Sequence, residues 1–174
     1  MILDLARLFF FPALMAFAAS SDLFTMTISN RVSLALAAGF FILAFASGMA
    51  PYEVLSHVGA GAVVLAAAFT CFAMGWIGGG DAKVAASAAL WFGFPHLLNF
   101  LLYASLFGGA LTLLMLQLRR WPLPSGLAKQ AWLLRLHEEK GDIPYGIALA
   151  LGGLMIYPET EWVRAIDLVR LPLH

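Results

Sequence analysis

Two of the ten acidic residues, Asp22 and Asp81, lie at the inner edge of the membrane in the topology derived below. An ionisable side chain at that depth is costly, and it therefore marks a candidate functional site. If the two carboxyls face each other, like charges resist double ionisation, so one keeps a proton while the other draws a proton from water. A general acid paired with a general base in this way can hydrolyse a peptide bond. We therefore treat Asp22 and Asp81 as candidate catalytic residues.

The residues around Asp81 suit such a site. Three consecutive glycines, Gly78, Gly79 and Gly80, precede it; they permit positive φ and leave room for a substrate strand to approach closely. Glycines in membrane helices also serve close helix packing. Lys83, two residues after Asp81, either tunes the acid pair or anchors the helix at the lipid headgroups. We expect the three glycines and Lys83 to shape the site.

The amino-acid composition indicates which class of protein positions these residues. Of 174 residues, 62% are hydrophobic and 11% are charged, and the formal net charge is zero. The mean hydropathy of +0.88 excludes a water-soluble globule. A balanced charge without a basic cluster gives no case for nucleic acid binding. The single cysteine, Cys71, excludes an intrachain disulfide and a cysteine metal site. The four histidines show no ligand spacing, so we expect neither a metal nor a cofactor.

Apolar runs separated by polar residues, glycines or prolines predict an all-α, polytopic membrane protein with about six transmembrane helices. The fourth run is too short to span a bilayer alone, and it begins at the Gly-rich turn before Asp81. We expect one integral-membrane domain over residues 1–174, whose end, residues 159–174, forms a short amphipathic tail on the outer face. The six predicted helices cover residues 2–20, 32–50, 54–76, 82–94, 96–118 and 143–157.

The distribution of Lys and Arg predicts the orientation. Seven of the ten basic residues fall in the inside loops when both termini are placed outside, and positive residues are retained on the cytoplasmic side. This topology puts Asp22 and Asp81 inside. The long inside loop, residues 117–142, is interpreted as a solvated connector. The alternative is a surface helix over residues 127–136, which would place Trp132 and Leu133 in the membrane interface. Ala16-Phe17-Ala18 also imitates a signal-peptide cleavage site, although Asp4 weakens the required positive region.

Several segments, in order along the chain, resemble one family. Gly78-Gly79-Gly80-Asp81-Ala82-Lys83 resembles the G-x-G-D segment of type IV prepilin peptidases, in particular the small prepilin peptidase of tight-adherence (Flp) pilus systems. Ser21-Asp22-Leu23, followed by Ile28-Ser29-Asn30, resembles the element at the end of that family's first helix. Tyr145-Gly146 resembles its last helix. Two features depart from the family pattern: Ser29 replaces the usual proline, and residues 24–27 lack the common basic residues.

The resemblance implies an aspartic endopeptidase with Asp22 and Asp81 as its catalytic residues and with no cofactor. Its substrate would be a type IV (Flp-type) prepilin or pseudopilin, whose short basic leader is removed after a glycine at the cytoplasmic face of the bacterial inner membrane. The lipid bilayer and the pilus assembly machinery are the other implied partners. Longer relatives carry a CxxC domain with N-methyltransferase activity after the first helix. Only residues 21–31 stand there in this chain, so peptidase activity alone is implied.

Other classes of protein make different predictions. A small proton- or cation-coupled transporter component would use Asp22 and Asp81 as a relay, but it also predicts polar residues in the centres of the spans, where almost none occur. A non-enzymatic scaffold of a pilus or secretion machine would use Asp81 as a helix cap and would tolerate asparagine there. A presenilin-type protease would place both aspartates deeper in the bilayer.

Overall fold

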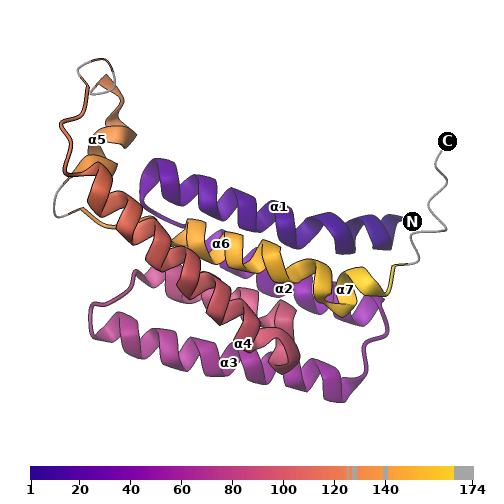
Figure 1. Cartoon of the computed structure of the whole chain (residues 1–174). Coiled ribbons are helices and arrows are strands. Elements are labelled where there is room, and N and C mark those ends of the chain that lie inside the picture. Colours follow the sequence, from indigo (N-terminus) through magenta and orange to yellow (C-terminus); the bar gives the residue numbers. More distant parts are fainter. Residues whose placement is uncertain (125, 127–128, 139–140, 167–174) are drawn as a thin grey trace.

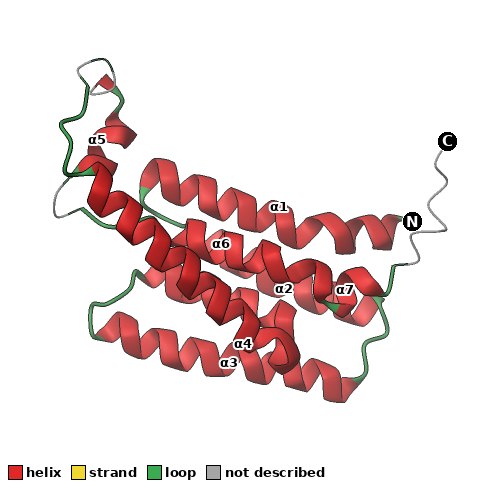
Figure 2. Ribbon diagram, viewed as in Figure 1, coloured by secondary structure: helices red, strands yellow, loops and turns green. Residues whose placement is uncertain are grey.

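The computed structural model describes residues 1–124, 126, 129–138 and 141–166, and its regular elements there are all helical (Figures 1 and 2). The all-α prediction is therefore confirmed. The calls that fall on residues 127–128, 139–140 and 167–174, in the inside loop and the tail, lie outside the described residues. In chain order the elements are α1 (Ile2–Thr25), α2 (Asn30–Ala46), α3 (Pro51–Ala73), α4 (Gly79–Leu118), α5 (Ala131–His137), α6 (Tyr145–Ile156), the 3-10 helix η2 (Tyr157–Glu159) and α7 (Glu161–Arg164).

Three helices in the described part of the chain, α1, α3 and α4, are long and apolar enough to cross a membrane, and α2 is a shorter apolar helix. Large apolar side chains such as Phe9, Leu98 and Leu113 point outward, each more than 60% exposed. An apolar surface of this kind is soluble in lipid rather than in water. The protein is therefore a membrane protein; six spans remain a prediction.

The fourth and fifth predicted helices are joined in α4, which is broken at Gly93. Gly93 has φ +57° and ψ −178°, a conformation that only glycine adopts readily. Pro95 follows and has no N–H to continue the hydrogen-bond ladder. The segment before the break, residues 79–92, is about 20 Å long at 1.5 Å per residue, less than the roughly 30 Å hydrocarbon core. It begins at Gly79, directly after Gly78, within the Gly-rich segment from which its start was predicted.

The break leaves two carbonyls of α4 without helical partners, and side chains from other helices satisfy them. His57 Nδ1, from α3, lies 2.5 Å from the carbonyl oxygen of Leu90. The indole Nε1–H of Trp162, in α7, donates to the carbonyl of Trp91 at 2.8 Å. Buried carbonyls must be paired in this way, because an unsatisfied one costs about 1–3 kcal/mol. The kink is therefore a supported part of the fold.

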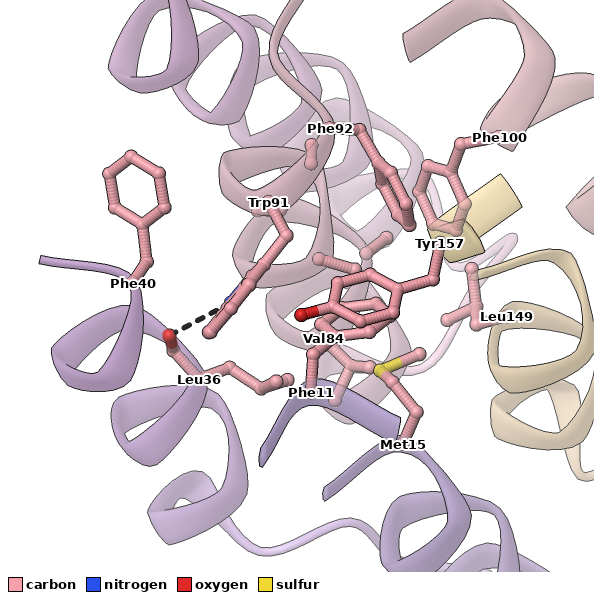
Figure 3. Packing of buried hydrophobic residues seen from close by; sticks show 14 of the residues in the cluster. Phe11, Met15, Leu36, Phe40, Val84, Trp91, Phe92, Phe100, Leu149 and Tyr157 are labelled. Carbon is pink, nitrogen blue, oxygen red and sulfur yellow. Dashed lines mark hydrogen bonds between the residues drawn. The ribbon is translucent and has the colours of Figure 1, made fainter. Parts of the chain in front are cut away.

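Trp91 is at the centre of the core (Figure 3). It is fully buried, packs against Phe11 with ring centroids 5.4 Å apart, and donates from Nε1 to the carbonyl of Leu36 at 3.0 Å. This hydrogen bond allows a polar indole nitrogen to lie in an apolar interior. Trp162, at the start of the predicted outer tail, is also buried, with its ring 5.1 Å from that of Trp91. The described part of the tail thus packs into the bundle.

The arrangement of the helices separates two ends of the molecule. α4 packs on α3, α6 and α2, and α1 packs on α6 and α2. The N-terminus lies at one end, and α5 projects from the other (Figure 1). Asp22 lies near the end of α1, and Asp81 lies in the first turn of α4. The candidate residues therefore belong to the end of the bundle that carries α5.

Candidate active site

Asp22 is one of the few buried polar side chains of the bundle, 6% exposed. Its Oδ2 accepts a 2.7 Å hydrogen bond from the backbone N–H of Gly146. Gly146 lies in the first turn of α6, where the N–H groups have no partner within the helix. The start of α6 thus holds the Asp22 carboxyl in one position.

Gly146 has little room for a side chain. A Cβ there would lie 2.9 Å from Asp22 Oδ2 and 2.7 Å from Ile28 Cδ1, closer than ordinary van der Waals contact. The absence of a side chain is therefore what lets the backbone of α6 approach the carboxyl. Gly146 was not among the predicted site residues, and its only signal in the sequence was the resemblance of Tyr145-Gly146 to the family's last helix.

Asp81 is half-buried in the first turn of α4, after the N-cap residue Gly78. A Cβ on Gly78 would lie 3.0 Å from Asp81 Oδ2, and one on Gly79 would lie 3.2 Å from the Phe72 ring. The first of these contacts shows that small size at Gly78 gives the Asp81 carboxyl its space.

The conformational role predicted for the glycine run is wrong. Among the described glycines, positive φ occurs at Gly48, Gly75 and Gly93, and at none of Gly78, Gly79 and Gly80. Gly78 is extended, with φ −69° and ψ 145°, and Gly79 and Gly80 already belong to α4. The turn between α3 and α4 takes its positive φ at Gly75 instead, at +74°. The run thus contributes space rather than backbone freedom.

Ile28 packs against the start of α4 and the start of α6. A Cβ on Gly80, next to Asp81, would lie 3.4 Å from Ile28 Cβ, while Ile28 Cδ1 lies against Gly146, beside Asp22. The structure thus brings Asp22 and Asp81 to the same end of the bundle, where Ile28 packs against the starts of both α4 and α6. Ile28 belongs to the short turn that Met26 closes with a left-handed φ of 53°.

Ser29, which stands where the family commonly has proline, is the N-cap of α2. Its Oγ accepts a hydrogen bond from Arg31 N at 3.3 Å, and serine is a favoured residue at this position. The departure from the family pattern therefore leaves a regular start to α2.

Lys83 does not point towards the acid pair. Its Nζ donates to Asn30 Oδ1 at 2.9 Å, which joins the start of α4 to the start of α2. Side chains two positions apart in a helix point about 200° apart, so Lys83 and Asp81 project from opposite sides of α4. Lys83 forms no ion pair with an acid within the described residues.

The long inside loop contains the helix α5 and is anchored next to the site, so the preference for a solvated connector over a helix is wrong for residues 131–137. Arg135 Nη2, in α5, donates to the carbonyl of Phe24 at 2.5 Å, and the Trp132 ring packs edge-on against the Phe24 ring at 5.3 Å. Arg119 donates to the carbonyls of Leu136, Gly141 and Asp142. The Phe24 contacts fasten the loop to the last turn of α1, two residues beyond Asp22, and the Arg119 contacts fasten it to the end of α4.

The fold and these residues define a helical membrane protein with two acidic side chains at one end of the bundle and no cluster of three or more His, Cys, Asp or Glu ligands within its described part. The model of the type IV leader peptidase family matches residues 9–113, which include both Asp22 and Asp81. This is more than half of the chain, and the protein therefore belongs to that family. No curated protein and no solved structure gave a significant match.

Proposed function

We propose that this protein is an aspartic endopeptidase that removes the leader from type IV prepilins or pseudopilins of the Flp type. Membership of the type IV leader peptidase family supports a peptidase acting on prepilins. The observation that carries the aspartic mechanism is that Asp22, in the last turn of α1, and Asp81, in the first turn of α4, lie at the same end of the bundle. We propose Asp22 and Asp81 as the catalytic residues and Gly78, Gly79 and Gly80 as residues that leave space around them.

In the proposed reaction one carboxylate takes a proton from water as the water oxygen bonds to the scissile carbonyl carbon. The other carboxyl is protonated and donates its proton to the carbonyl oxygen, so that the carbonyl carbon becomes the centre of a tetrahedral intermediate. A proton then passes to the leaving nitrogen, and the C–N bond breaks. The hydrogen bond from Gly146 to Asp22 keeps one carboxyl oriented, so the entropic cost of positioning this carboxyl is not added to the activation barrier. The peptidase step alone is proposed, because α1 and α2 are joined by only residues 26–29.

We place the site at the cytoplasmic face of the bacterial inner membrane. The distribution of Lys and Arg supports this orientation, and Asp22 and Asp81 lie at the end of the bundle that carries the Arg119 and Arg135 loop. A prepilin whose apolar helix lies in the bilayer and whose basic leader stays inside would present its cleavage site at this level. Contact with the pilus assembly machinery belongs to the same proposal.

The test is leader removal from a co-expressed Flp-type prepilin, read as a mobility shift at matched membrane levels. Asp22→Asn and Asp81→Asn keep the side-chain size but remove the ability to exchange a proton, so each should lower cleavage by a factor of about 100 or more. Asp4→Asn, at the opposite end of α1, is the matched control and should cleave as the wild type does. Near wild-type cleavage by either site variant would refute the two-aspartate mechanism.

A further inference from the structure

A groove of about 550 Å³ lies between α2, α3 and the first segment of α4. α2 contributes Asn30, Ser33 and Ala37, and α4 contributes Lys83, Ser87 and Leu90. On each helix these residues recur every three or four positions, so the groove follows the helix axes for about two turns. Leu34 and Leu65 also line the groove and are 68% and 48% exposed, so the groove opens on an apolar surface that faces lipid.

The polarity of the groove changes along its length. At its inner end Lys83 supplies a positive charge, and Lys83 Nζ is hydrogen-bonded to Asn30 Oδ1. Because Asn30 accepts through Oδ1, its amide N–H groups remain as donors. One turn further along lie the hydroxyls of Ser33 and Ser87, and another turn further lie Ala37 and Leu90. From its inner end, the groove thus presents a cation, then two hydroxyls and then hydrocarbon.

The two serines point to a ligand. Ser33 and Ser87 are 8% and 9% exposed, yet neither side chain is hydrogen-bonded to another group in the described part of the chain. No fully enclosed polar side-chain atom in this part lacks a partner, so both oxygens are open to the groove that they line. Two nearly buried hydroxyls facing an apolar groove call for an occupant with acceptor atoms at that depth.

The groove is not a path to the aspartates. Lys83 and Asp81 project from opposite sides of α4, about 200° apart, so α4 itself separates an occupant of the groove from the Asp81 carboxyl. The floor is closed by direct packing of α3 on α4, since a Cβ on Gly61 would lie 2.7 Å from Leu90 Cδ2. These observations favour a lipid over the substrate helix as the occupant.

We propose that this groove binds one glycerophospholipid. Its phosphate accepts hydrogen bonds from Lys83 and the Asn30 amide, its ester carbonyls accept from Ser33 and Ser87, and one acyl chain lies along Ala37 and Leu90. Basic pockets between membrane helices are typical phosphate sites of this kind. The lipid fills the space between α2 and α4 and steadies the first segment of α4, which carries Asp81 at its start.

The test uses the full chain in detergent, with bound lipid counted by native mass spectrometry. Dioleoyl phosphatidylglycerol is compared with dioleoylglycerol, which has the same chains but no phosphate. We expect one phosphatidylglycerol to be retained and Lys83→Gln to weaken its binding about tenfold, because a charge-assisted hydrogen bond is lost. Ala62→Phe fills the groove from an exposed position of α3 and should abolish retention.

Matched controls are Arg120→Gln, which removes a positive charge from an exposed position outside the groove, and Ala110→Phe, which adds a ring to an exposed position of the second segment of α4. Both should retain the lipid as the wild type does. Equal binding of dioleoylglycerol, or full retention by Ala62→Phe, would overturn the proposal. So would a disulfide formed between Ala62→Cys, in a Cys71→Ala background, and a cysteine in the apolar helix of a prepilin, because the groove would then hold the substrate.

Discussion

The backbone N–H of Gly146 lies 2.7 Å from Oδ2 of Asp22, although 124 positions separate the two residues in the chain. This hydrogen bond joins the last turn of α1 to the first turn of α6, at the end of the bundle where Asp81 also lies. An N–H group at the start of a helix is a good donor to a carboxyl oxygen. α6 therefore orients one member of the proposed catalytic pair without contributing a reactive side chain.

Gly146→Ala should lower the rate of prepilin cleavage at least tenfold while the protein still accumulates in the membrane. The added Cβ would lie within 2.9 Å of Asp22 Oδ2 and 2.7 Å of Ile28 Cδ1, so the carboxyl must move. A small displacement of a catalytic group can cost this much or more. The measurement is the initial rate of leader removal in isolated membranes.

The control for this prediction is Gly109→Ala, where no atom lies within 4 Å of the added Cβ and the rate should be unchanged. A second variant, Gly146→Ala with Ile28→Val, removes the Cδ1 contact and should recover part of the activity. If Gly146→Ala alone cleaves at the wild-type rate, the hydrogen bond to Asp22 has no role in positioning the carboxyl.

Gly93→Ala should destabilise the protein by about 1–3 kcal/mol, because Gly93 has φ +57° in a region that other residues avoid. The new Cβ would also lie 2.9 Å from His57 Nε2. Thermal unfolding in detergent, followed by circular dichroism, measures the effect against Gly109→Ala. An unchanged melting temperature would show that α4 can straighten at this position without cost.

The break in α4 was predicted from local residues, but its partners were not. The two apolar runs were predicted to end and begin around Pro95, and proline commonly kinks or breaks a helix. That His57 and Trp162 satisfy the freed carbonyls depends on how α3 and α7 pack around α4, which no local pattern specifies. In the same way, Asp22 and Asp81 stood out as acids beside apolar runs, whereas Gly146 and Ile28 became visible only once α6 and the turn before α2 were in place.

The inside loop shows the same limit. Its mixed charge favoured a solvated connector over a surface helix, whereas residues 131–137 form α5. Arg119 and Arg135 instead donate to backbone carbonyls of the loop and of α1, because carbonyl groups left free at helix ends and turns need donors. Such acceptors belong to the backbone, so the pattern of side chains in the sequence does not predict where they lie.

His57→Phe should cost about 1–3 kcal/mol of unfolding free energy, because the carbonyl of Leu90 would lose its donor. A carbonyl oxygen only accepts, so His57 Nδ1 carries the proton in this contact. His57→Asn places an amide N–H near the same point and should recover part of the loss. Equal melting temperatures for the Phe variant and the wild type would show that the Leu90 carbonyl finds another donor.

Trp132→Ala should loosen the inside loop without unfolding the bundle. The Trp132 ring packs on Phe24 at 5.3 Å, and an aromatic pair of this kind contributes about 0.5–1.5 kcal/mol. Its loss should increase the rate at which trypsin cleaves the loop about two- to tenfold, as measured in inside-out membrane vesicles. Trp121→Ala, whose exposed side chain forms no aromatic pair within the described residues, is the control and should be cleaved at the wild-type rate. Because the loop is fastened beside Asp22, the rate of prepilin cleavage should fall with the loss of Trp132 and not with the loss of Trp121. Equal rates of trypsin cleavage for the two variants would show that the Phe24 contact does not hold the loop.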